Sequence, residues 1–197
     1  FNQIKHPQKS AKNILRYRAN SVTFDTSAAN GGITLNNLTS GTPANYFSYN
    51  ALAFNAGAGT LTVNGSNTFN YWNANAAVTL IGQVTGSGNI TGTRLNGALT
   101  LTFDNPGSST YSGVIAGGTT MSVVKTGAGT QIFSGTNTYT GATTINLGTL
   151  AIGGAGALGG GSYAGNVINN GAFLYNSSAA QTLSGVISGS GGLTQTG

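Results

Sequence analysis

Short alternations of apolar and hydroxyl-bearing residues recur along the chain, separated by glycine, asparagine and serine. Examples are Ile33-Thr34-Leu35, Thr60-Leu61-Thr62-Val63, Leu99-Thr100-Leu101-Thr102-Phe103, Thr143-Thr144-Ile145 and Thr149-Leu150-Ala151-Ile152. A period of two predicts β-strands that bury one face and turn threonine outward on the other. Glycine and asparagine between the runs allow corners with positive φ. The pattern therefore predicts an all-β chain built from many short strands.

Longer stretches of the sequence repeat at fixed offsets. Residues 57–69 (GAGTLTVNGSNTF) return 70 positions later at 127–139 (GAGTQIFSGTNTY), and residues 145–152 (INLGTLAI) return 23 positions later at 168–175 (INNGAFLY). Three units of about 23 residues make one unit of 70, and this length is typical of one coil of a β-solenoid. We therefore expect a parallel β-helix over residues 21–197, with a sandwich or meander as the competing fold.

Composition excludes several classes of function. The chain of 197 residues has 33 Gly, no Cys, two acidic residues and only 5% charged residues. Without cysteine there is neither a disulfide framework nor a thiolate site, and two acids are too few for an EF-hand or a two-metal centre. No apolar run reaches the roughly 18 residues that a membrane helix needs. We expect no metal site, no cofactor and no membrane-spanning segment.

The positive charge is concentrated before the predicted strands. Five of the seven cations lie there: Lys5, Lys9, Lys12, Arg16 and Arg18. Residues 1–20 are therefore predicted to be an irregular basic arm or linker. In the rest of the chain Arg94 and Lys125 balance Asp25 and Asp104. Because so few cations remain to bind phosphates, we expect no nucleic-acid partner.

Residues 124–150, VKTGAGTQIFSGTNTYTGATTINLGTL, carry a pattern of lysine, glycine and N-T-Y at fixed spacing. The stretch resembles the autotransporter-associated β-strand repeat, also called the passenger-associated transport repeat, with Gln131 in place of the usual leucine. Residues 57–69 are a weaker copy. The repeat positions that we single out are Gly57, Gly59, Asn67, Phe69, Gly127, Gly129, Asn137, Tyr139, Gly148 and Gly171.

The resemblance implies a right-handed parallel β-helix in a large bacterial surface or secreted protein. In that family the repeat forms a stalk and carries no catalytic residues, so none is transferred to this chain. The expected localisation is extracellular or at the bacterial cell surface.

Residues that suggest catalysis are scattered. His6 is the one histidine and lies in the basic arm, and Asp25 and Asp104 fall in different predicted coils. We interpret His6 as a solvated residue and the two aspartates as turn-capping residues rather than a glycosidase pair. The glycine runs at 153–156 and 159–161 lack the Lys-Ser/Thr of a phosphate loop, so we expect a flexible excursion between coils there.

Aromatic residues gather between positions 46 and 72. An exposed aromatic platform stacks on sugars or on a partner protein, whereas a buried one packs inside the fold. The candidate contact residues for a surface glycan are Tyr46, Tyr49, Tyr71 and Trp72. This reading makes the chain an adhesin or glycan-binding module.

The sequence as a whole favours a structural stalk or fibre-forming element without enzymatic activity. The partner expected from an unpaired parallel strand is the chain itself, by stacking end to end or by continuation of a longer rod. A glycan-binding module is the alternative. A polysaccharide lyase is more remote, because Arg94 and Lys125 stand alone and no carboxylates cluster.

Overall fold

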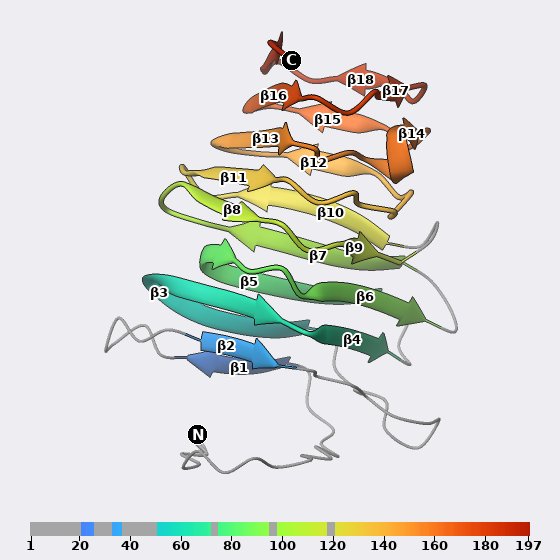
Figure 1. Ribbon diagram of the computed structural model, residues 1–197. Helices are drawn as coiled ribbons and strands as arrows, with labels where there is room; N and C mark the ends of the chain where they lie inside the picture. The colour runs from blue at the N-terminus through green and yellow to red at the C-terminus, as the bar shows by residue number, and fades with distance from the viewer. Residues whose placement is uncertain (1–20, 26–32, 37–50, 72–74, 95–97, 118–120) are drawn as a thin grey trace.

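A computed structural model describes residues 21–25, 33–36, 51–71, 75–94, 98–117 and 121–197, which form a stack of β-strands (Figure 1). The predicted basic arm, residues 1–20, lies outside the described residues. The strands are β1 (Ser21–Asp25), β2 (Ile33–Asn36), β3 (Ala51–Asn64), β4 (Ser66–Tyr71), β5 (Asn75–Thr85), β6 (Asn89–Arg94), β7 (Ala98–Asp104), β8 (Ser109–Tyr111), β9 (Ile115–Ala116), β10 (Met121–Thr126), β11 (Thr130–Phe133), β12 (Thr143–Ile145), β13 (Thr149–Gly154), β14 (Ser162–Tyr163), β15 (Val167–Asn169), β16 (Ala172–Ser177), β17 (Thr182–Leu183), β18 (Ile187–Ser188) and β19 (Gly192–Gln195).

Strands inside a sheet pair with the strands of the turn before and the turn after, and strands at the sheet edges pair on one side. The first sheet has the order β1-β3-β5-β7-β10-β12-β15-β18, with β2 also paired to β3, and the second has the order β8-β11-β13-β16-β19. Shorter sheets, β4-β6-β9 and β14-β17, form a third side. Every pairing between described strands is parallel. The predicted parallel β-solenoid is confirmed, and the competing fold of antiparallel hairpins is wrong.

The length of one turn follows from the strand register. Val78 pairs with Leu101, 23 positions later, and Val123 pairs with Thr143, 20 positions later. The first sheet advances six steps between β3 and β18, which corresponds to about six turns of the solenoid. Figure 1 shows these turns piled along one axis. The expected coil of about 23 residues is therefore confirmed.

The core is a set of columns that run along this axis. In β10 burial alternates strictly, with Met121, Val123 and Lys125 turned inward. Leu101, Val123 and Thr143 lie above one another in successive turns. Because period two sets which side chains face inward, burial of the aliphatic members stabilises the stack by roughly 1.5–3 kcal/mol per side chain.

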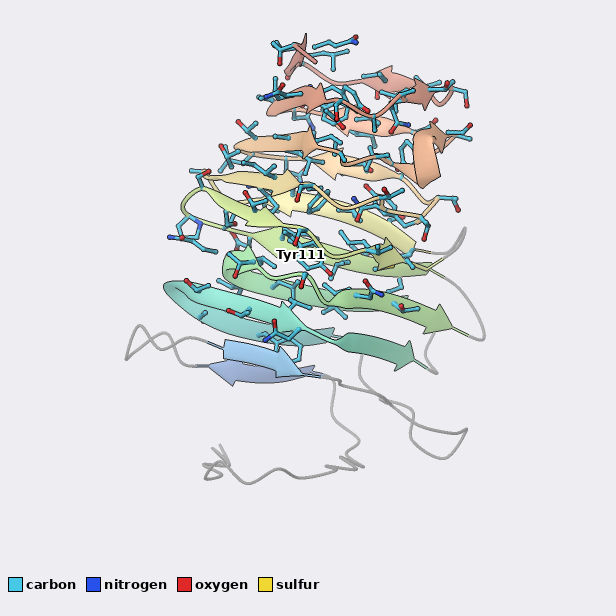
Figure 2. The ribbon with its side chains drawn as sticks, viewed as in Figure 1. Tyr111 is labelled. Atoms are coloured by element: carbon cyan, nitrogen blue, oxygen red, sulfur yellow. The ribbon has the colours of Figure 1, made fainter. Side chains whose placement is uncertain are left out.

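Aromatic rings pack against one another in the interior of the stack. Phe103 and Phe133 meet edge to face with ring centroids 5.0 Å apart, and Tyr111 lies 6.5 Å from Phe133. Tyr111, labelled in Figure 2, is fully buried and donates its hydroxyl to the carbonyl of Gly88 one turn earlier. Burial raises the pKa of Tyr111, because the phenolate would lose its hydration.

The glycine-rich segment 153–161 is packed onto the stack, which corrects the expected flexible excursion. It makes one tight turn, with the Gly156 amide bonded to the Gly153 carbonyl at 2.9 Å, and ends in the 3-10 helix η3 (Gly159–Gly161). Leu158 is fully buried. The side chain of Gln181 bonds to both backbone groups of Leu158, at 2.7 and 3.1 Å, as a neighbouring strand would.

Helices play little part in this architecture. Over the residues that the structure describes, none is long and apolar enough to cross a membrane.

Candidate functional site

The two copies of the repeat lie three turns apart in the stack. Thr60 in the first copy pairs with Gln83 on β5, and Lys125 in the second pairs with Phe103 on β7, so β5 and β7 separate the copies. Gly57, Gly59, Asn67 and Phe69 of the first copy lie in β3 and β4. Residues of the second copy occupy β10 to β13 and the corners between them. An offset of 70 residues therefore corresponds to three turns, as the sequence predicts.

A column of glycines forms the corner between the first and second sheets. Its members are Gly107, Gly129, Gly148, Gly171 and Gly191, one from each successive turn. A Cβ on Gly129 would lie 2.1 Å from the Gly107 carbonyl oxygen, and one on Gly171 would lie 2.5 Å from that of Gly148. Backbone bonds cross the column, as from the Thr149 amide to the Gly129 carbonyl at 3.1 Å. Any side chain here would push neighbouring turns apart.

The sequence identified the middle of this column and missed its ends. Gly129, Gly148 and Gly171 are among the predicted repeat positions, whereas Gly107 and Gly191 are not. Gly107 follows a proline and Gly191 follows Gly189-Ser190, so neither is surrounded by a recognisable copy of the repeat. The one signal that identifies them is their distance of about one coil from the next glycine.

Two further corners are also lined by stacked glycines. A Cβ on Gly135 would lie 2.2 Å from the Gly113 carbonyl oxygen, and one on Gly113 would lie 1.8 Å from that of Gly88. At another corner a Cβ on Gly185 would lie 2.3 Å from the Gly165 carbonyl oxygen. Glycine therefore permits the close approach of neighbouring turns wherever the chain changes direction.

Lys125 is a buried cation at the corner of the repeat. Its side chain is fully enclosed, between Phe103 of the turn before and Ile145 of the turn after. The ammonium donates to the carbonyls of Thr126 and Gly127, the latter at 2.8 Å, and reaches the carbonyl of Leu147 at 3.4 Å. Thr126 and Gly127 belong to its own corner and Leu147 to the next. One side chain thus serves carbonyls of two successive turns.

The electrostatics of Lys125 are set by burial. Loss of hydration lowers the pKa of the lysine to about 8, and the opposing attraction of Asp104 does not restore it. The carboxylate of Asp104 lies by the same corner, next to Gly127. The ammonium therefore costs folding energy when charged, even though carbonyl oxygens surround it.

Asn137 joins two sheets on the third side of the solenoid. The sheet β4-β6-β9 ends one turn below it and the sheet β14-β17 begins one turn above. Its side-chain oxygen accepts the Ile115 amide at 3.0 Å, and its side-chain nitrogen donates to Gly135 at 3.0 Å and to Ala157 at 3.4 Å. The asparagine of N-T-Y therefore supplies the bonds that a strand would otherwise make.

The tyrosine of the same motif belongs to a buried chain of hydroxyls. Tyr139 bonds to Thr143 at 2.8 Å, Thr143 bonds to Tyr163 at 2.7 Å, and Tyr163 donates to the carbonyl of Gly141. The two tyrosine rings meet edge to face at 5.7 Å. Burial is the main cause that raises the pKa of both Tyr139 and Tyr163. This cluster therefore holds turns together as neutral hydroxyls.

Gln131, which stands where the repeat usually has leucine, spans three turns of the core. It is fully buried, accepts the Ser109 hydroxyl at 3.0 Å and donates to the Val84 carbonyl at 3.2 Å. The second sheet ends at β8, and Gly86 bridges in parallel to Tyr111 on that strand, so Val84 lies in the turn next to this end of the sheet. The glutamine side chain reaches across this end of the sheet. Nothing in the sequence alone points to this role.

Two buried asparagines each leave one oxygen unpaired. Asn105 donates to Gly107 at 2.7 Å and Asn169 donates to Gly192 at 2.8 Å, both at the glycine corner. The side-chain oxygens of both residues are buried and have no protein partner. Such an acceptor is a site for an ordered water molecule.

The residues suggested for catalysis are not brought together. Asp25 is on β1 and Asp104 on β7, with β3 and β5 between them in the sheet. Parallel neighbours are about 4.8 Å apart, so three steps separate the two backbones by roughly 14 Å. Among the described residues no three His, Cys, Asp or Glu side chains gather as a metal site would require. His6 lies outside them.

The aromatic cluster is largely beyond what the structure describes. Tyr46, Tyr49 and Trp72 lie outside the described residues. Tyr71 is the last residue of β4, and only its backbone is described. Phe54, another aromatic residue between positions 46 and 72, is buried in the core.

A hollow lies at the C-terminal end of the stack. It has a volume of about 400 Å³, and Phe173, Tyr175, Gln181 and Leu193 are among its lining residues. Leu193 and Ile187 continue inward-facing columns of the core, yet they are 54% and 39% exposed. The hollow is thus the interior of the solenoid at its edge strands β18 and β19.

Comparison with known proteins identifies the repeat. The Passenger-associated-transport-repeat family matches residues 56–70 and 123–152. These two segments contain the predicted copies at 57–69 and 124–150, and the second contains the Lys125 corner and the N-T-Y motif. No curated protein and no solved structure matches the chain.

Proposed function

We propose that this chain, which carries two passenger-associated transport repeats, is a structural stalk or fibre-forming segment of a bacterial surface or secreted protein. The single observation that supports this function best is the way in which the repeat is used. Its lysine and the asparagine of N-T-Y bond to neighbouring turns, and its glycines let those turns approach closely. These contacts serve the continuity of the rod.

The mechanism of such a segment is mechanical. Parallel backbone ladders join every turn to the next, and glycine columns let the turns approach closely at the corners. A protease needs several residues in extended form outside the fold, and continuous pairing denies it that access. A nearly uncharged rod also gains no self-repulsion as it lengthens.

Absence of catalysis is part of the proposal. A polysaccharide lyase needs carboxylates or a basic residue in an open groove. In the described part of the chain, Lys125 is enclosed and bonded to backbone carbonyls, and Asp104 stands apart from Asp25. These placements support a scaffold over an enzyme.

We further propose that the partner of the rod is another turn of a parallel β-solenoid of the same kind. Inward-facing residues of the last layer, such as Leu193, are exposed where β19 and β18 have no following strand. A parallel strand added there would cover them and pair with their backbone. Both continuation of the rod and end-to-end stacking of copies meet this requirement.

A direct test combines proteolysis with imaging. The proposal expects residues 121–197 to resist proteinase K in the folded chain, and electron microscopy of the purified parent protein to show narrow, rigid rods. A compact globular particle, or rapid cleavage within this region, would refute the stalk.

The glycan-binding alternative is separated by a matched pair of variants. A glycan array probed with the unmodified chain, with Trp72→Ala and with Tyr175→Phe, a tyrosine on β16 outside the 46–72 segment, assigns any binding to the aromatic cluster. Binding lost only in Trp72→Ala would support an adhesive module. If the unmodified chain binds no glycan, the result supports the structural stalk over the glycan-binding module.

A further inference from the structure

Among the contacts that join neighbouring turns, the one made by Lys125 depends on a proton. A lysine ammonium has three N–H donors, and here three carbonyl oxygens lie around it. Two belong to Thr126 and Gly127 in the turn of the lysine itself. The third is the carbonyl of Leu147 in the next turn, and it is the farthest of the three from the ammonium nitrogen, at 3.4 Å.

We infer that Lys125 makes the corner of the repeat a pH-sensitive clamp between two successive turns. A neutral amine keeps only two N–H donors, so one of the three carbonyls loses its partner when the proton leaves. The longest bond is the weakest, and it is the bond to Leu147 that crosses between turns. Deprotonation therefore releases the next corner and keeps the bonds within the first.

The surroundings of Lys125 contain one charged group that opposes this release. From β7 the neighbours are Phe103 and Asp104, and from β12 the neighbour is Ile145. Asp104 favours the ammonium, whereas burial disfavours it and prevails. Within the described part of the chain, neither β12 nor the Leu147 corner brings another titratable side chain to it. The clamp thus titrates below the range of ordinary lysines, with a pKa of about 8.

Local and global effects of this proton have opposite signs. Loss of the Leu147 bond loosens one corner. The same deprotonation removes a buried charge, so the whole chain becomes more stable as the pH rises from about 8 toward the ordinary lysine value. A general effect of alkaline pH would change the stability of the corner and the stability of the whole chain in the same direction. This combination distinguishes a clamp from a lysine that is simply buried.

Nuclear magnetic resonance of the intact chain tests the clamp. The Leu147 carbonyl shift should titrate together with the Lys125 side-chain nitrogen, with a midpoint near pH 8. The protection factor of the adjacent Thr149 amide should fall about tenfold across this titration, the scale of one lost hydrogen bond. The Val186 carbonyl, which accepts the Val167 amide at 2.9 Å, serves as an internal control and should stay constant.

Two variants decide whether the proton on Lys125 is responsible. In Lys125→Met the Leu147 carbonyl and the Thr149 protection factor should show no step near pH 8, and Lys125→Gln provides the same comparison if the first variant does not fold. A step that persists in a folded variant overturns the clamp. If neither variant folds, a parent Leu147 carbonyl that stays constant while the lysine nitrogen titrates overturns it equally.

Discussion

Individual residues of this chain act on the turns above and below them more than on their sequence neighbours. Gly148, Lys125 and Gln131 each touch backbone from another turn, 19 to 47 residues away. A substitution at such a position is felt as a change in the spacing or bonding of whole turns. Residue-scale predictions can therefore be made from these contacts.

The glycine column predicts that a side chain there has a steric cost. Two glycines with similar backbone conformation distinguish this cost from the cost of backbone strain. Gly148 and Gly160 have φ values of 69° and 65°, but a Cβ would meet the Gly129 carbonyl oxygen at 2.4 Å in the first and nothing within 4 Å in the second. Gly148→Ala should lower the free energy of unfolding by about 3 kcal/mol or more, and Gly160→Ala by about 1 kcal/mol. Urea denaturation measures both, and equal losses would count against close approach at the column.

Gln131 predicts that restoring the usual residue of the repeat does harm. Gln131→Leu leaves the Val84 carbonyl and the Ser109 hydroxyl without their partner inside the core. The loss should be about 2–3 kcal/mol, the cost of buried unpaired groups. In a double-mutant cycle with Ser109→Ala, denaturation should reveal coupling of about 1 kcal/mol. Strictly additive losses would contradict the bond between the two side chains.

The buried titratable groups predict a maximum in stability at alkaline pH. Lys125 has a folded pKa of about 8, below its unfolded value of 10.5, so the free energy of unfolding should rise as pH increases between these values. Tyr111, Tyr139 and Tyr163 have raised pKa values, so stability should fall as pH passes about 10, where unfolded tyrosine ionises. Urea denaturation from pH 7 to 11 measures both limbs. The rising limb should vanish in Lys125→Met, and its survival there would assign it to another group.

At the scale of strands and corners, the periodicity of the sequence predicted the longer strands but not the shortest ones. Alternation in Leu99-Thr100-Leu101-Thr102-Phe103 predicted β7, because burial of one face requires period two. The run Thr149-Leu150-Ala151-Ile152 predicted most of β13, although burial in that strand is continuous from Leu150 to Ile152 and does not alternate. Strands of two residues, such as β9 and β18, give no such pattern. Their strand character comes from the neighbouring turns.

The candidate site shows the same division. Repeat positions such as Gly129 and Asn137 could be singled out from spacing, because the copies align. The bonds of Lys125 to Leu147 and of Gln131 to Val84 could not be predicted, because they depend on how far each turn is displaced along the stack. The sequence also suggested looseness at 153–161, where the buried side chain of Leu158 and its bonds to Gln181 hold the segment.

For the molecule as a whole, a solenoid is modular in units of complete turns. Removal of residues 57–126, 70 residues or three turns, joins Ala56 to Gly127 in place of Gly57. The shortened chain should fold with a cooperative thermal transition, because each remaining turn meets an equivalent neighbour. Removal of residues 57–114 instead leaves a fractional turn and should give an aggregated or unfolded chain. Circular dichroism and size-exclusion chromatography distinguish these results, and equal behaviour of the two deletions would argue against modular turns.

The parallel stacking of turns is the claim on which the whole account depends, and introduced cysteine pairs test it most directly because the chain has no cysteine of its own. Thr100 pairs with Ser122 and Thr102 with Val124 across β7 and β10, at outward positions where neighbouring backbones are within disulfide range. Oxidation should cross-link Thr100→Cys with Ser122→Cys, and Thr102→Cys with Val124→Cys. It should leave Thr100→Cys with Val124→Cys mostly reduced. Efficient cross-linking of that last pair, with failure of the first two, would mean antiparallel strands and would contradict the solenoid.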